Sequence, residues 1–284
     1  MLVALSEISQ LARKPLDGCN DFFSCIQVAM LNYPTLQISI ADRLATITLD
    51  SGKVNAITTQ LSRDLEAAFL DLGGNDEVDG VVLAGKPNCF CAGLDVKLLA
   101  TSDRDGLREF FATYLSALQT LVRFEKPLVA AVTGFAPAGG TIIALTADYR
   151  IMAQGPKHTV GMNEFNMSLQ IPKMMGDIFA YYVGEATAWK NVQQARMYTA
   201  KEAMPLGLVD EATTVEEVLP RAETYCRQLM QVHPPVFKRT KRYLRRGILA
   251  AVDHEVATMV DVIAEDFDDP KFKQMMALFV ASLR

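Results

Sequence analysis

The order of short buried strands and helical patterns constrains the fold of this chain more than any other feature. Residues 80–84 and 128–132 are short apolar runs that indicate buried strands, and residues 107–122 between them carry apolar side chains at helical spacing. Residues 36–40 and 44–49 alternate apolar and polar side chains, which indicates a hairpin with one buried face. Because helices that alternate with strands cover the faces of a sheet, this order predicts an α/β fold with functional loops at strand ends.

The chain divides into three expected parts. Residues 1–29 mix basic and acidic side chains, unlike a mitochondrial presequence, and we expect a poorly ordered extension there. Residues 30–212 form the expected α/β core, which ends with a short strand near residues 208–210. Residues 213–284 are helical in pattern and form an expected C-terminal helical region.

Composition and charge narrow the kinds of partner. The formal net charge of −5 gives no overall attraction to nucleic acid or to an anionic membrane, and no apolar run is long enough to cross a bilayer. We therefore expect small-molecule partners, with no nucleic acid and no membrane among them. One basic cluster has helical spacing and indicates a solvated helix face on an acidic protein: Lys238, Arg239, Lys241, Arg242, Arg245 and Arg246.

Cysteine and histidine usage predicts no metal site. The five cysteines form an odd set without a Cys-x-x-Cys pair, and the three histidines are scattered along the chain. Free thiols favour a reducing compartment, so we expect the cytoplasm or, for a eukaryotic chain, the mitochondrial matrix.

Two glycine-containing turns follow buried strands. Residues 88–95 lead from a strand into a helical pattern, and Gly93 allows a tight turn that leaves the Leu94 amide pointing outward. Residues 134–140 repeat this arrangement, with Gly139 as the second outward amide. Either turn alone is more simply explained as a connection without a ligand. Together they predict an oxyanion hole, because two converging amides can hold the oxygen of an enolate.

Glu164 is the candidate proton-transfer group. It lies in Gly161-Met162-Asn163-Glu164-Phe165, among apolar neighbours that raise the affinity of a carboxylate for protons. A carboxylate whose pKa is nearer the working pH is suited to general acid–base catalysis. A helix-capping or surface glutamate is the simpler explanation unless the two turns lie beside it.

At this point the sequence resembles the crotonase, or enoyl-CoA hydratase/isomerase, superfamily over residues 33–284. The motifs that carry the resemblance are Asn55-Ala56-Ile57, Phe90-Cys91-Ala92-Gly93-Leu94-Asp95, the turn of residues 134–140, and Gly207-Leu208-Val209-Asp210. The resemblance implies a spiral of ββα units, with a C-terminal helical region that forms homotrimers or dimers of trimers. It also implies an acyl-CoA substrate and no cofactor beyond the coenzyme A of that substrate.

The resemblance also assigns residue roles. The two oxyanion amides are those of Leu94 and Gly139, and Glu164 is catalytic. The contacts expected with the substrate and its CoA involve Lys53, Ala92, Asp95, Lys97 and Gly140, with the backbone near Ala92 meeting the adenine.

Within the superfamily the chain looks most like the 3,2-enoyl-CoA isomerases. Hydratases carry a second glutamate just after the second turn, where this chain has Ile142, and dienoyl-CoA isomerases carry an aspartate where it has Pro172. One remaining carboxylate suffices to move a double bond, because Glu164 can take a proton from C2 and return it at C4. An enoyl-CoA hydratase or another crotonase-type lyase or hydrolase is the alternative enzyme. A non-catalytic acyl-CoA-binding subunit is the alternative outside enzymes.

Overall fold

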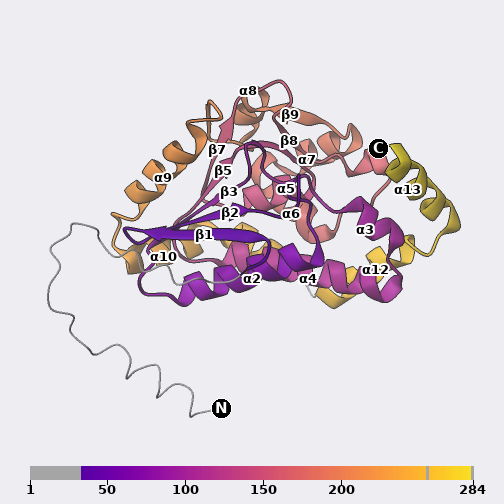
Figure 1. Cartoon of the computed structure of the whole chain (residues 1–284), viewed down its shortest axis with the longest axis horizontal. Coiled ribbons are helices and arrows are strands. Elements are labelled where there is room, and N and C mark those ends of the chain that lie inside the picture. Colours follow the sequence, from indigo (N-terminus) through magenta and orange to yellow (C-terminus); the bar gives the residue numbers. More distant parts are fainter. Residues whose placement is uncertain (1–32, 254–255, 283–284) are drawn as a thin grey trace, which may run out of the picture.

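The computed structural model describes residues 33–253 and 256–282, and it has the predicted α/β architecture (Figure 1). The extension expected over residues 1–29 lies outside the described residues. No helix in the described part of the chain is long and apolar enough to cross a membrane.

The larger sheet has six strands in the order β1-β2-β3-β5-β7-β10. β1 runs antiparallel to β2, and each later neighbouring pair is parallel. The strands are β1 (Leu36–Ala41), β2 (Leu44–Leu49), β3 (Gly80–Ala84), β5 (Leu128–Val132), β7 (Tyr149–Ala153) and β10 (Glu211–Thr213). The first four were predicted from the sequence and are confirmed.

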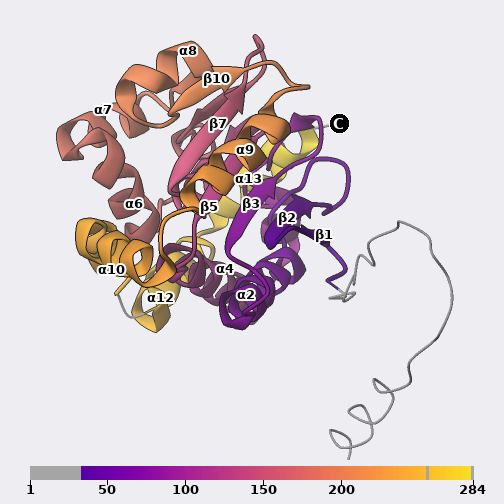
Figure 2. The ribbon, with the colours of Figure 1, turned by 90° about the vertical axis from the view of Figure 1, so that its left-hand side faces the viewer.

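Both faces of the central strands β3 and β5 are buried, which explains why these strands are continuous apolar runs. Val82 and Ala84 of β3 pack with helix α9 (Val218–Leu229), whereas Val81 and Leu83 belong to the core on the other face. That second core includes α2 (Thr59–Gly74) and α4 (Arg104–Arg123), which pack on each other. Figure 2 shows α9 on its side of the sheet, with α2 and α4 away from it.

A smaller sheet has the order β4-β6-β8-β9. Its strands are β4 (Asn88–Cys89), β6 (Gly134–Pro137), β8 (Thr159–Gly161) and β9 (Met197–Thr199). β4 and β6 follow the carboxyl ends of β3 and β5 along the chain, so the two glycine turns begin at the same end of the larger sheet.

The remaining helices follow these strands or form the C-terminal part. They are α3 (Val96–Thr101), α5 (Gly139–Leu145), the 3-10 turn η1 (Glu164–Met167), α6 (Lys173–Val183), α7 (Glu185–Gln193), α8 (Ala200–Ala203), the 3-10 turn η2 (Met204–Leu206), α10 (Pro234–Leu244), α11 (Arg246–Ala251), α12 (Val256–Asp266) and α13 (Pro270–Ser282). α12 packs on α4, and α13 packs on α3 and reaches η1, at the right of Figure 1. The C-terminal helices therefore pack on the core of their own chain.

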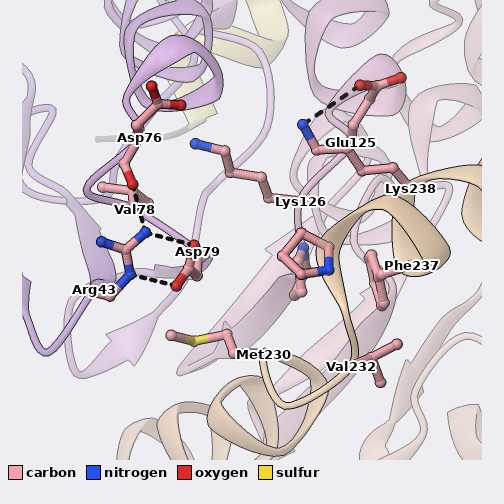
Figure 3. Close-up of a pocket in the computed structure, with 12 residues that line it drawn as sticks. Arg43, Asp76, Val78, Asp79, Glu125, Lys126, Met230, Val232, Phe237 and Lys238 are labelled. Atoms are coloured by element: carbon pink, nitrogen blue, oxygen red, sulfur yellow. Dashed lines mark hydrogen bonds and ion pairs between the residues drawn. The ribbon is translucent and has the colours of Figure 1, made fainter.

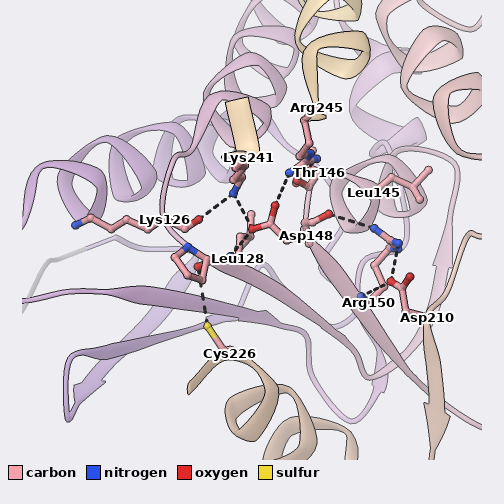
Figure 4. Close-up of polar contacts among 12 residues, drawn as sticks. Lys126, Leu128, Leu145, Thr146, Asp148, Arg150, Asp210, Cys226, Lys241 and Arg245 are labelled. Carbon is pink, nitrogen blue, oxygen red and sulfur yellow. Dashed lines mark hydrogen bonds and ion pairs between the residues drawn. The ribbon is translucent and has the colours of Figure 1, made fainter. Parts of the chain in front are cut away.

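Helix α10 is fixed to the sheet by a buried ion cluster around Asp148 (Figure 4). Asp148 Oδ2 accepts hydrogen bonds from Lys241 Nζ at 2.7 Å and from the Leu128 amide at 2.9 Å, and Asp148 Oδ1 pairs with Arg245 at 2.7 Å. The side chains of Lys241 and Arg245 are only 7% and 12% exposed. The expectation of a fully solvated basic face is therefore wrong for these two residues, because a buried carboxylate gives them a counter-charge.

The strand expected near residues 208–210 is displaced to β10, three residues further on. Asp210 instead accepts hydrogen bonds from the backbone and side chain of Arg150, so its side chain anchors the turn that leads into β10. Gly207 adopts a positive φ of 77° at the end of η2, where a side chain would be strained.

Candidate active site

The first glycine turn directs the Leu94 amide away from the adjacent segment at Ile57. Ile57 and Leu94 form an isolated parallel bridge in which the Ile57 amide donates to Gly93 O and the Asp95 amide donates to Ile57 O, at 2.8 and 3.0 Å. In such a bridge the Gly93 carbonyl group and the Asp95 amide face Ile57, so the amide of Leu94 between them faces away from Ile57. Asn55, whose side chain donates to Phe90 O, holds this segment in register.

The second turn is strained at Ala138. Ala138 has φ 52° and ψ −121°, a combination that L-residues rarely adopt, and its amide donates to Gly161 O at 2.7 Å. Gly139 follows as the first residue of α5, where an amide has no partner inside the helix. The Gly139 amide is thereby available to a ligand.

The two turns lie in direct contact. A Cβ added to Gly93 would lie 3.0 Å from Pro137 O and 3.7 Å from the Gly139 nitrogen. A Cβ added to Gly140 would lie 2.2 Å from Cys91 O, which excludes any side chain at that position. The structure therefore brings Leu94 and Gly139 together, and it gives Gly140 a packing function.

Glu164 is a buried acid beside these turns. It follows β8, which pairs with β6 at Pro137 and Gly161, and only 2% of the residue is exposed. Within the described residues, neither of its carboxylate oxygens has a hydrogen-bond partner. Burial raises its pKa from 4.5 to about 7, and the nearby backbone N–H groups of Glu164 and Asn163 offset only part of this effect. Glu164 is thus neither a helix cap nor a surface residue.

An unpaired buried carboxylate with a pKa near neutrality is suited to accepting and returning a proton. Two backbone amides beside it are suited to holding an oxygen that gains negative charge. The arrangement can support chemistry in which a proton leaves carbon next to a carbonyl group. Among the described residues no group of three or more His, Cys, Asp or Glu side chains could hold a metal ion.

Tyr114 also lies at this site, although the sequence analysis did not single it out. Its residue is 1% exposed, and its hydroxyl donates to Gly139 O at 3.2 Å. Burial raises its pKa well above 10, with smaller contributions from Cys91 and Glu164. The sequence did contain a signal for Tyr114, because it lies in the apolar stripe of residues 107–122, and a buried tyrosine hydroxyl needs a hydrogen-bond partner.

The residues expected to contact CoA lie near the first turn, in different settings. The Ala92 amide donates to Val54 O, which places Lys53 next to this strand segment. Lys53 and Lys97 are exposed. The Asp95 carboxylate accepts hydrogen bonds from the amides of Lys97 and Leu98, so it caps α3. Their contacts with CoA stay predictions.

Pockets also open at the opposite, amino end of the parallel strands. One of about 220 Å³ lies where β3 and β5 begin, and Figure 3 shows the residues that line it. Arg43 pairs there with Asp79, and Lys126 donates to the carbonyl groups of Leu72 and Asn75. These charged groups already have partners within the protein, so we interpret this pocket as a structural junction between α2 and α10. The catalytic candidates lie at the other end of the sheet.

The sequence profile described as enoyl-CoA hydratase/isomerase matches residues 39–283 of this chain. The mitochondrial enoyl-CoA delta isomerase 1 of Homo sapiens is 27% identical over 232 residues, which cover 78% of this chain and 76% of that protein. A probable enoyl-CoA hydratase of Rhizobium meliloti is 29% identical over 254 residues, which cover 88% and 96%.

Solved structures show the same fold. The crystal structure of human mitochondrial delta3-delta2-enoyl-CoA isomerase superposes with a TM-score of 0.84 at 22% identity, covering 88% of this chain and 98% of that one. The expected crotonase-like spiral with a C-terminal helical region is therefore confirmed.

Proposed function

The chain belongs to the enoyl-CoA hydratase/isomerase family, and from that premise we propose that it moves the double bond of a 3-enoyl-CoA to the 2-position. The observation that carries this proposal is that Glu164 is a buried carboxylate without an acidic neighbour on α5, which contains no Asp or Glu. Ile142 is fully buried at the position where family hydratases place their second glutamate. Hydration uses two carboxylates to position water, whereas double-bond transfer needs one group that moves one proton.

In the proposed reaction Glu164 removes a proton from C2 of the 3-enoyl thioester. The electron pair of that C–H bond moves into conjugation with the carbonyl group, and the thioester oxygen gains the negative charge of a dienolate. The amides of Leu94 and Gly139 hold this oxygen. The protonated Glu164 then delivers the same proton to C4, which leaves the double bond between C2 and C3.

The proposed substrate binding uses the first turn. Backbone near Ala92 would contact the adenine, and Lys53 and Lys97 would meet the CoA phosphates, with Asp95 and Gly140 shaping the turn beside the thioester. Coenzyme A enters as part of the substrate, and the reaction needs no further cofactor. The homotrimer or dimer of trimers, and the location in the cytoplasm or mitochondrial matrix, stay predictions.

The test is to incubate the purified protein separately with a 3-enoyl-CoA and a 2-enoyl-CoA, and to identify the products. We expect the 3-enoyl substrate to yield the 2-enoyl product and the 2-enoyl substrate to gain no water. Glu164→Gln should abolish this turnover and retain acyl-CoA binding. A matched control is Glu217→Gln, which changes an exposed glutamate next to α9 and should leave turnover unchanged.

Enoyl-CoA hydratase is the second candidate, because the relative from Rhizobium meliloti is a probable hydratase. Water addition to the 2-enoyl substrate without isomerisation of the 3-enoyl substrate would replace our proposal with this one. Binding of both acyl-CoAs with no change to either would identify a non-catalytic acyl-CoA-binding subunit.

A further inference from the structure

The strained turn at Ala138 is held at both of its ends. On the amino side the Ala138 amide donates to Gly161 O at 2.7 Å. On the carboxyl side the Tyr114 hydroxyl donates to Gly139 O at 3.2 Å. A backbone conformation like that of Ala138 persists only where the surrounding structure fixes it. The peptide that carries the Gly139 amide lies between these two anchors.

The Tyr114 hydroxyl also lies against the α-carbon of Gly139. A Cβ added to Gly139 would lie 2.8 Å from the Tyr114 oxygen, 2.8 Å from Ile57 Cδ1 and 3.4 Å from Leu94 Cδ2. The second turn therefore packs in a cradle formed by α4, the first turn and Ile57. The hydroxyl is the only part of this cradle that donates a hydrogen bond to Gly139 O among the contacts in the described residues.

We propose that Tyr114 is a positioning residue, whose hydroxyl fixes the direction of the Gly139 amide and so sets the geometry of the oxyanion hole. The Ile142 amide donates to Ala138 O at 3.1 Å, so this peptide is already fixed within α5, and the Tyr114 hydroxyl fixes the start of α5 relative to α4. Without the hydrogen bond to Gly139 O, the start of α5 shifts, and the Gly139 amide moves relative to the Leu94 amide. This inference rests on the proposed function, since it assumes that both amides hold the thioester oxygen. Tyr114 acts through Gly139 and does not itself exchange a proton with the substrate.

Tyr114→Phe is the central variant, because phenylalanine fills the same volume and removes only the hydroxyl. We expect kcat for isomerisation to fall about ten- to a hundredfold with KM nearly unchanged, since a misplaced donor weakens transition-state binding. The pH at which activity is half maximal should stay where it is in the wild type, because the proton-transfer group is unaltered.

Tyr182→Phe is a matched control. The Tyr182 hydroxyl donates to Leu145 O at 2.8 Å, at the other end of the same helix α5. This variant also removes a tyrosine hydroxyl, here a partly buried one, from an α5 carbonyl oxygen, but far from the Gly139 amide. We expect its kcat to stay within about twofold of the wild type. Equal losses of kcat in both variants would show a general loosening of α5 and overturn the proposal.

A spectroscopic measurement separates this inference from the proposed reaction. The infrared carbonyl stretch of acetyl-CoA, carbon-13 labelled at the thioester carbonyl, should move to lower frequency when the wild type binds it, because two amides polarise the bond. Tyr114→Phe should lose much of this shift and Tyr182→Phe should keep it. A full shift in Tyr114→Phe overturns the positioning role. A wild type that shows the shift but does not isomerise 3-enoyl-CoA overturns the proposed function alone.

Discussion

Gly93 and Gly139 lie so close together that a Cβ on Gly93 would approach the Gly139 nitrogen to 3.7 Å. The two glycines belong to different turns and are 46 positions apart in the sequence. Their contact comes from parallel pairing of β4 with β6. The spacing of the two amides is therefore set by backbone packing, which a single methyl group can disturb.

Gly93→Ala should lower kcat about a hundredfold or more. Gly93 has φ 79°, and its new Cβ would lie 3.0 Å from Pro137 O, so the first turn must shift and take the Leu94 amide with it. Steady-state kinetics with a 3-enoyl-CoA measure the loss. Gly176→Ala in α6 is the control, because its Cβ meets no atom within 4 Å. Wild-type kcat in Gly93→Ala would show that the turn does not position the hole.

Ala138→Gly should stabilise the protein by about 1 kcal/mol. Glycine adopts φ 52° without strain, and the relief exceeds the extra chain entropy of glycine in the unfolded state. Urea unfolding at neutral pH measures the change. Ala144→Gly, inside α5, is the control and should destabilise by a similar amount, because its backbone is helical. Two equal losses of stability would mean that Ala138 is not strained.

The activity should rise with pH through a midpoint near neutrality. Glu164 accepts the C2 proton only as a carboxylate, and burial raises its pKa to about 7. A profile of kcat/KM against pH reports this ionisation in the free enzyme. A profile that is flat from pH 6 to about 8 would contradict the assignment of Glu164 as the base.

The same carboxylate should destabilise the folded protein at high pH. The folded pKa of about 7 lies above the ordinary value of 4.5, so the folded state binds the proton more tightly. The contribution of Glu164 to the free energy of unfolding is therefore greatest below pH 4.5, and it falls as the pH rises to about 7. Glu164→Gln should remove this dependence and raise the free energy of unfolding by up to about 3 kcal/mol at pH 8.

Unfolding by urea at pH 5 and at pH 8 measures this effect in both proteins. The difference between variant and wild type should be larger at pH 8, where wild-type Glu164 is ionised. An equal difference at both pH values would mean that Glu164 has an ordinary pKa.

Asp148→Asn should destabilise the protein by about 3 to 5 kcal/mol, because it leaves the buried cations Lys241 and Arg245 without a counter-charge. Chemical unfolding measures the loss. The control is Glu109→Gln, which removes an ion pair with Arg63 whose side chains are more than half exposed. That change should alter stability by less than about 1 kcal/mol. A similarly small effect in Asp148→Asn would mean that the ion cluster around Asp148 is exposed to solvent.

Much of the fold could be predicted from the sequence, because strand and helix periodicities are local. The central strands are continuous apolar runs because both faces are covered, and Thr58 caps α2 where the helical pattern begins. The strands β4, β6, β7 and β8 were not predicted. Two further short strands show the reason most clearly: β9 was missed, and β10 lies three residues beyond its expected place. Each has three residues, too few for a periodic pattern to identify, and each exists because a neighbouring strand supplies its hydrogen bonds.

The sequence by itself determined the small residues of the two turns, the position of Glu164 and the absence of a second acid at Ile142. Only the tertiary structure decided that the turns touch, that Glu164 is buried with no hydrogen-bond partner for its carboxylate in the described part of the chain, and that Tyr114 reaches Gly139. Local sequence sets backbone preferences and the chemistry of each side chain. Burial and contacts between distant segments depend on which surfaces the packed sheets and helices bring together. It is burial that raises the pKa of Glu164.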